Sequence, residues 1–280
     1  MKTYLIPTDF SSSSVAAIHY AAHLSTQTGV SKLILLHAYH VSTLESILPS
    51  TEFVQMVPQD IAENSRLKML ELQDIKSEIS GIVNEGVEIE LQLVRLPLLR
   101  AILEIQENNP VDLLVLCSKY PQEDMQVGRN IVEISKISPA PVLVVPGKAV
   151  AVPLKKLVLA CDFKKVTETI PLEKLNKVWE VLQAELLVVN VDQKGLHQQK
   201  DPKMLAQESA LYQMLKPYQP QYFFIDHADT IRGIVDFAVD NEAQIIIALP
   251  RKYSFFESFL PSNITAELTI KSSLPVLLLK

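Results

Sequence analysis

Two aspartates are the residues of this sequence best placed for chemistry. Asp9 directly follows a predicted strand at 2–8, and Asp162 directly follows a predicted strand at 155–161. A carboxylate at the carboxyl end of a parallel strand faces the crevice where such sheets bind ligands, and there it accepts hydrogen bonds. The same carboxylate equally holds the turn into the next helix. Both interpretations stay open for both residues.

The histidines are weaker candidates for a metal-binding or catalytic role. His19 and His23 lie one turn apart on a predicted helix, a spacing at which two imidazoles share a metal ion. No Cys, Asp or Glu between them or in the next turn completes such a site, so we expect two partly buried helix histidines and no metal. His37 and His40 follow a strand without an evident nucleophile to serve, and we expect no catalytic residue.

Other motifs of known chemistry are missing from the sequence. It contains no Gly-x-Gly-x-x-Gly, no P-loop and no His-Glu-x-x-His, which argues against dinucleotide oxidoreductases, P-loop ATPases and zincin proteases. Cys117 and Cys161 each end a strand, and we expect small, buried, reduced residues rather than reactive thiols. Four aromatic residues within 253–260 predict packing at a domain or subunit interface.

The composition limits the class of protein. The chain has 280 residues, of which 48% are apolar and 21% charged, and its net charge is −6. These values predict about two globular domains and no nucleic-acid partner, because neutralising phosphates needs a basic face. No apolar run approaches the roughly 20 residues of a membrane span, so we expect no membrane association and a cytoplasmic protein. Glycine is scarce, with seven residues against a usual share of about 7%.

The positioning elements come from an internal repeat. Residues 5–10 (Leu-Ile-Pro-Thr-Asp-Phe) correspond to 158–163 (Val-Leu-Ala-Cys-Asp-Phe), and 33–37 correspond to 186–190, at one offset of 153. Residues 138–145 correspond to 272–279 at an offset of 134. Matching blocks in the same order predict two copies of one fold, a first domain at 1–148 and a second at 153–280.

Both copies alternate strands with helices. Strands such as 113–116 and 245–248 are continuously apolar, as in parallel sheets covered on both faces. We therefore predict two tandem doubly wound α/β domains, Rossmann-like, each with a five-stranded parallel sheet. The predicted strands are 2–8, 32–38, 87–94, 111–117, 141–145, 155–161, 185–191, 220–226, 243–249 and 274–279. The predicted helices are 12–28, 59–80, 97–108, 128–137, 169–183, 202–216, 229–240 and 262–272.

Particular residues also resemble a known family. The segment Pro7-Thr8-Asp9-Phe10-Ser11, the later Leu35-Leu36-His37 and the run Ser-Pro-Ala-Pro-Val-Leu-Val-Val-Pro at 138–146 resemble universal stress protein domains, whose fold is that of the adenine nucleotide α-hydrolase group. The resemblance spans the chain as two tandem domains. It implies that the last strands of the two halves pair, here within one chain, and it leaves further homodimerisation and protein partners open.

The family resemblance also implies where ATP would bind. Members that bind ATP carry a loop of the form Gly-x2-Gly-x9-Gly-Ser/Thr after the fourth strand, where bare backbone amides approach phosphate. Of the three glycine positions in the first half only Gly128 is glycine, and the loop 249–263 of the second half contains none. The resemblance implies a nucleotide site formed by Thr8, Asp9, Gly128, Arg129, Asn130 and, in the second half, Asp162.

The altered loops decide the functional expectation. We expect a non-catalytic stress-response or signalling protein in which ATP binding is weak or lost and no cofactor is required. The alternative is an ATP-binding switch whose site lies in the first half only. A third possibility is a binding module for another small molecule in the altered crevice.

Overall fold

The structure is a computed structural model that describes residues 2–39, 58–118, 125–162, 165–182, 184–192, 202–250 and 264–280. The chain forms two compact units, Met1–Val115 and Leu116–Lys280. Among the described residues, none of the helices is long and apolar enough to cross a membrane.

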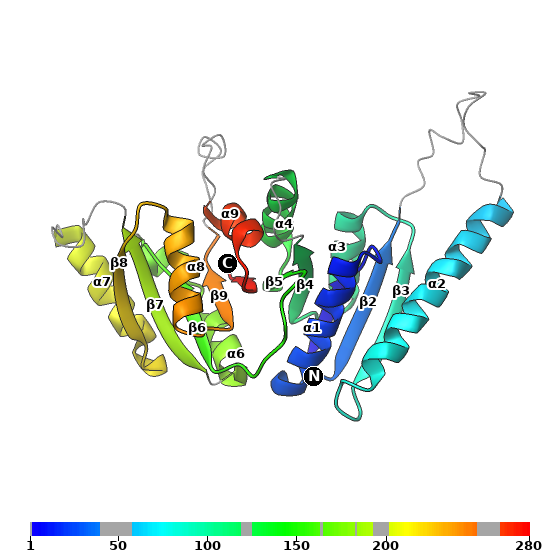
Figure 1. Ribbon diagram of the computed structural model, residues 1–280, viewed down its shortest axis with the longest axis horizontal. Helices are drawn as coiled ribbons and strands as arrows, with labels where there is room; N and C mark the ends of the chain where they lie inside the picture. The colour runs from blue at the N-terminus through cyan, green and yellow to red at the C-terminus, as the bar shows by residue number, and fades with distance from the viewer. Residues whose placement is uncertain are drawn as a thin grey trace, which may run out of the picture. The chain divides into compact units, whose positions relative to one another are not determined.

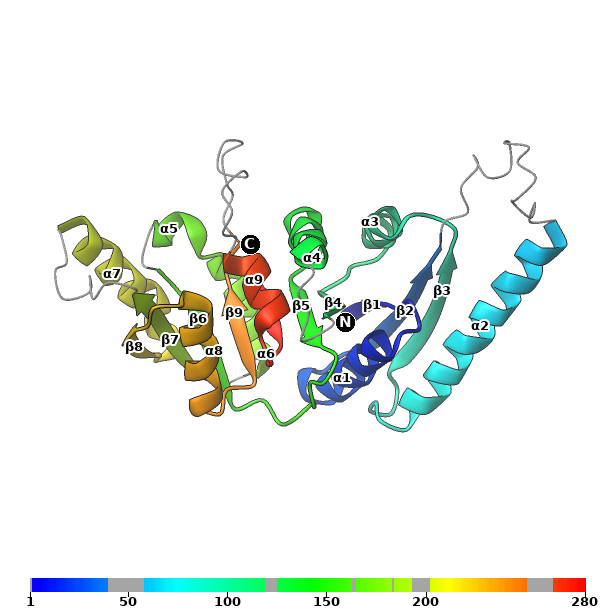
Figure 2. The same cartoon turned by 45° about the horizontal axis from the view of Figure 1, so that its top comes forward.

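The first unit is built on parallel strands in the order β3-β2-β1-β4. These strands are β1 (Thr3–Pro7), β2 (Lys32–Ala38), β3 (Glu88–Val94) and β4 (Leu113–Ser118), which runs across the boundary between the units. Its helices are α1 (Ser12–Thr28), α2 (Pro58–Ser80) and α3 (Leu98–Asn108). Figure 2 shows α1 and α2 on one face of the strands and α3 on the other. Because both faces are covered, every residue of β1 is buried.

The second unit contains six further strands in the order β5-β10-β9-β6-β7-β8. They are β5 (Val142–Pro146), β6 (Lys156–Ala160), β7 (Glu185–Asp192), β8 (Gln221–Asp226), β9 (Ile245–Ala248) and β10 (Val276–Leu278). Strand β10 is antiparallel to β5, whereas the other pairs are parallel.

The helices of the second unit cover both faces of its strands (Figure 1). They are α4 (Met125–Ile137), α5 (Val166–Thr169), α6 (Leu172–Leu182), α7 (Pro202–Leu215), α8 (Thr230–Asp240) and α9 (Ile264–Lys271), with a 3-10 turn at Lys216–Tyr218. Helices α4 and α9 pack against each other. Helix α4 follows β4 and helix α9 follows β9, and these two strands occupy equivalent positions in the two repeat copies.

Hydrogen bonds confirm the repeat at atomic level, because they recur at the offsets of the sequence. The strand order β8-β7-β6-β9 also repeats the order β3-β2-β1-β4. The matched bonds are His37 Nδ1 to the Thr8 carbonyl (2.8 Å) with Asn190 Nδ2 to the Cys161 carbonyl (2.9 Å), and Ser138 Oγ to the Ala140 carbonyl (2.9 Å) with Ser272 Oγ to the Leu274 carbonyl (2.7 Å). The predicted fold class, two tandem doubly wound α/β domains, is confirmed.

The division into compact units differs from the division of the repeat. The sequence repeat predicts a boundary between residues 148 and 153, whereas spatial contacts group residues 116–148 with the second half. The reason is that β5 pairs with β10 and α4 packs on α9. The repeat marks which segments are copies of each other, and the compact units mark which segments touch.

Local signals explain several helix ends. Helix α1 begins at the predicted residue because the Ser11 hydroxyl accepts the Ser14 N–H, and it ends at Gly29, whose φ of 61° is left-handed. Helix α4 begins at 125, three residues before its predicted start. The predicted helix at 169–183 is α6, which begins three residues later, after Pro171; the short helix α5 before it was not predicted.

Candidate functional site

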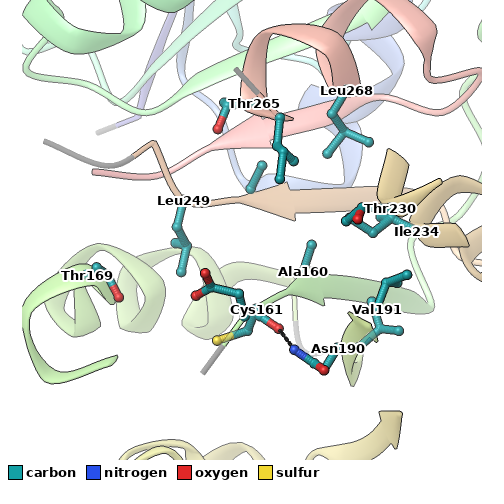
Figure 3. A pocket seen from close by; sticks show the side chains of 14 residues that line it. Ala160, Cys161, Thr169, Asn190, Val191, Thr230, Ile234, Leu249, Thr265 and Leu268 are labelled. Atoms are coloured by element: carbon teal, nitrogen blue, oxygen red, sulfur yellow. Dashed lines mark hydrogen bonds between the residues drawn. The ribbon is translucent and has the colours of Figure 1, made fainter. Parts of the chain in front are cut away.

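The strand order of the second unit reverses at β6, which pairs in parallel with β7 on one side and with β9 on the other. A crevice at this point is where doubly wound sheets bind ligands. A cavity of about 150 Å³ lies there, at the carboxyl ends of the strands (Figure 3). Its described walls are Ala160, Cys161, Asp162, Thr169, Val189, Asn190, Val191, Thr230, Ile234, Ala248, Leu249, Ile264, Thr265 and Leu268.

Asn190 holds two edges of this cavity together. It is only 6% exposed, and its Nδ2 donates to the Cys161 carbonyl at 2.9 Å, the dashed line in Figure 3. A carbonyl oxygen only accepts, so the bond fixes which end of the amide is nitrogen. Oδ1 of Asn190 therefore lies in the wall as an acceptor, and it has no partner among the described residues.

The charged residue among the described walls of the cavity is an acid. Asp162, the sequence-predicted residue, lines the cavity and is exposed. No Lys, Arg or His is found among the described lining residues. Nearby, Asp229 caps helix α8, and its Oδ1 accepts the N–H groups of Ile231 and Arg232 at 2.9 and 3.1 Å. The amino-terminal end of α8, whose residues Thr230 and Ile234 line the cavity, therefore already carries an anion.

In the first unit, Thr8 and Asp9 hold the turn between β1 and α1. Oγ1 of Thr8 accepts the Phe10 N–H at 3.0 Å, and Oδ1 of Asp9 accepts the Ser11 N–H at 3.0 Å. Burial would raise the pKa of the Asp9 carboxyl, but hydrogen bonding to Ser11 and Ser14 outweighs burial and lowers it. Asp9 is thus an ionised turn residue whose carboxylate is still exposed.

A group of rings stands beside Asp9. Phe10 has a left-handed φ of 63°, which is strained for a residue with a side chain. Its ring stacks on the imidazole of His37 at 4.3 Å, and the Tyr39 ring lies 6.0 Å beyond. Nζ of Lys68, from α2, lies 5.6 Å from the Phe10 centroid and 5.8 Å from that of Tyr39. Aromatic faces and a cation therefore meet at the carboxyl ends of β1 and β2.

His37 is the buried polar residue of this group, at 5% exposure. Its Nδ1 bonds the Thr8 carbonyl, so Nδ1 carries the proton and Nε2 is a bare acceptor. Nε2 is buried and unpartnered among the described residues. Burial is the largest cause that lowers the pKa of His37, and the Lys68 charge adds to it. The Thr8 carbonyl, Glu71 and Asp9 oppose both.

The remaining predicted residues lie in the second unit or outside the residues that the structure describes. Gly128, Arg129 and Asn130 lie in the first turns of α4, in the second unit, and their side chains fall outside the described residues. The predicted site is therefore represented by Thr8 and Asp9 in one unit and by Asp162 in the other. His40 and the aromatic loop 253–260 also lie outside the described residues.

The histidines of α1 differ partly from expectation. His19 is half-buried and bonds Glu78 Oε2 at 3.2 Å, whereas His23 is exposed rather than partly buried. Cys117 and Cys161 are not joined in a disulfide and are half-buried, so the prediction that they are buried was wrong in degree. Within the described part of the chain, no three His, Cys, Asp or Glu side chains gather as metal ligands.

Sequence reasoning missed most of the cavity wall. Asn190, Thr230 and Thr265 carry some of its polar atoms, and none of them belongs to a motif. One signal was available for Asn190, because the repeat offset of 153 makes it equivalent to His37, near the end of the second strand of its repeat copy.

Several solved structures share this fold. A universal stress protein from Archaeoglobus fulgidus DSM 4304 is 16% identical, covers 99% of this chain and 96% of its own, and superposes with a TM-score of 0.69. A putative universal stress protein from Pseudomonas aeruginosa UCBPP-PA14 is 14% identical, with coverages of 100% and 93% and a TM-score of 0.58. The curated proteins compared with the chain gave no match.

A family model supplies evidence at the level of sequence. The model of the universal stress protein family matches residues 1–146, slightly more than half of the chain. The second half repeats the strand order and hydrogen bonds of that region. The chain belongs to the universal stress protein family, as a tandem member with two copies of its fold.

Proposed function

We propose that this chain is a non-catalytic stress-response or signalling protein in which ATP is bound weakly or not at all. The observation that carries this proposal is the small cavity of the second half. Its volume of about 150 Å³ is below the roughly 300–1,000 Å³ of pockets that hold drug-sized ligands. A nucleoside triphosphate is a ligand of that size class and needs a pocket of that kind.

Electrostatics supports the same conclusion. A phosphate is best held by free backbone amides and positive charge. Here two amides at the start of α8, those of Ile231 and Arg232, are occupied by the Asp229 carboxylate, and the charged residue of the described lining is the acid Asp162. The loop after β9, residues 249–263, has no glycine that would let its backbone approach a phosphate.

Calorimetry tests this proposal directly. ATP with magnesium, titrated into the full chain, should give little or no heat. A dissociation constant below about 10 μM, close to 7 kcal/mol of binding free energy, would contradict it.

The second candidate function is a nucleotide-dependent switch that uses the first half only. It is favoured by the rings of Phe10 and His37 with Lys68 beside them, since aromatic faces stack on bases and a cation pairs with phosphate. Its residues are Thr8, Asp9, Gly128, Arg129 and Asn130.

Asp9 separates this candidate from the first. If the first half binds ATP, then ATP should raise the melting temperature of the full chain, and Asp9→Ala should abolish that shift. Asp9→Asn keeps the turn to Ser11 and removes only the charge, and Asp162→Ala is the matched control in the other half. An ATP-dependent shift that persists in both Asp9 variants rejects the candidate.

A further inference from the structure

Helix α3 carries its charges in the reverse of the order that stabilises an isolated helix. Arg100 lies in its first turn and Glu107 in its last, and α3 has no acid in the first turn and no base in the last. The amino-terminal end of a helix is partially positive and the carboxyl-terminal end partially negative, so each end of α3 repels the charge that it carries. Helix α9 has the favourable order, with Glu267 in its first turn and Lys271 in its last.

The two charges of α3 are not compensated within the described part of the chain. The side chains of Arg100 and Glu107 are exposed, and neither has a hydrogen bond or an ion pair among the described residues. In α8, by contrast, Arg232 of the first turn pairs with Asp236 one turn later, at 3.8 Å. The charges of α3 are therefore available to a partner.

Leucine lies between these charges on the outward face of α3. In the first unit, α3 is the one described helix on its side of the strands, so no neighbouring helix of that unit covers this face (Figure 2). Leu99 is 41% exposed, and Leu103 is half-buried. The spacing of Arg100, Leu103 and Glu107, three and then four residues, places them in one row along the helix. The row runs from a cation through a leucine to an anion.

We propose that α3 is the docking surface for a second copy of this chain, with the two α3 helices antiparallel about a twofold axis near Leu103. The two Leu103 side chains then meet at the axis, and Arg100 of each copy lies opposite Glu107 of the other. The antiparallel order also places each charge beside the end of the partner helix that attracts it. A surface that is complementary to itself in this way forms a closed dimer. The proposal does not depend on whether ATP binds.

The size of the contact sets the expected affinity. Helix α3 has 11 residues, which span about 17 Å. A contact along one such helix belongs to the small, transient class of interfaces, so we expect a dissociation constant on the order of 100 μM. Sedimentation equilibrium of the full chain, at concentrations from about 10 to 500 μM, covers this range.

Charge reversals test the pairing of residues. Arg100→Glu and, separately, Glu107→Arg should each weaken dimerisation by about tenfold or more, because each brings like charges together at both ends of the contact. Neither should unfold α3, since each reversal supplies the charge that the helix dipole favours at that end. An equimolar mixture of the two variants should dimerise again, because every arginine then faces a glutamate. Lys203→Glu makes the same change of charge in the first turn of α7 and should leave dimerisation unchanged.

Three results would overturn the proposal. They are a wild-type chain that stays monomeric over the whole concentration range, an Arg100→Glu variant that dimerises as the wild type does, and a mixture of the two variants that stays monomeric. A dimer formed through another surface gives the second result. Calorimetric binding of ATP would contradict the proposed function and leave these measurements untouched, so the two failures are distinguishable.

Discussion

The imidazole of His37 and the amide of Asn190 make equivalent bonds in the two halves, and this equivalence predicts the effect of exchanging one for the other. In His37→Asn, the new Nδ2 should bond the Thr8 carbonyl as Asn190 Nδ2 bonds the Cys161 carbonyl. In His37→Leu, the carbonyl of Thr8 loses its side-chain donor. The two variants remove the same ring and differ in that one hydrogen bond.

The structure gives the sizes of the competing effects. Both variants lose the stack with Phe10, worth about 0.5–1.5 kcal/mol. Both also remove the buried, unpaired Nε2, whose desolvation costs about 1–3 kcal/mol. These effects oppose each other. At pH 7.5 the free energy of unfolding of His37→Asn should therefore lie within about 1 kcal/mol of that of the wild type. His37→Leu leaves a buried carbonyl unpaired and should be about 1–3 kcal/mol less stable than His37→Asn.

The pH dependence has a defined sign. Burial holds the pKa of folded His37 below its ordinary value of 6.5, which the unfolded chain keeps. Below about pH 6.5 the unfolded chain therefore binds a proton that the folded chain does not. The wild type should lose stability as the pH falls from there toward the folded-state pKa, by at most about 1.4 kcal/mol per pH unit. His37→Asn lacks this loss.

Urea unfolding at pH 7.5, 6.5 and 5.5, followed by far-UV circular dichroism, measures the difference between wild type and variants. Fluorescence of Trp179, the single tryptophan, reports the second unit and serves as the internal control. The reasoning fails if His37→Asn is as unstable as His37→Leu, or if its stability falls with pH as steeply as that of the wild type.

Three further substitutions test packing, capping and the repeat by thermal or urea unfolding. Gly233→Ala should lower the free energy of unfolding by about 1–2 kcal/mol, although alanine has the better helix propensity, because the new Cβ would lie 2.9 Å from the Cβ of His227. Gly81→Ala is the control, since its Cβ would meet open space, and it should leave the stability unchanged. Asp229→Ala should cost about 0.5–2 kcal/mol and Asp229→Asn much less, since asparagine also caps α8; equal losses would exclude a capping role. Ser272→Ala should cost about 1–3 kcal/mol, because its buried hydroxyl bonds two backbone groups, and a neutral result would show that they find other partners.

The fold was predictable from the sequence because its signals are local or repeated. Strands such as β9 are uninterrupted apolar runs, and α1 carries its own start at Ser11 and its own stop at Gly29. The pairing of the last strands of the two halves, β5 with β10, followed from the family resemblance. The three-residue length of β10 was not predictable, because its extent is set by pairing with β5 rather than by its own residues.

The candidate site was less predictable because its parts are assembled in space. The cavity wall combines residues from six separate segments between 160 and 268, and each of them is an ordinary strand or helix residue in the sequence. The lone acceptors at His37 Nε2 and Asn190 Oδ1 depend on which atom faces the neighbouring carbonyl. Asp9 was identified, and its bond to Ser11 matches the turn interpretation that the sequence left open.

The antiparallel ladder of β5 and β10, with Leu143 opposite Leu277, joins two strands of one polypeptide. Dilution cannot separate them, so this ladder forms in a cell that holds a few molecules as readily as in a concentrated solution. When two identical chains meet about a twofold axis, every mutation appears on both sides at once. Here each side has its own codons, so one strand can change while the other stays as it was.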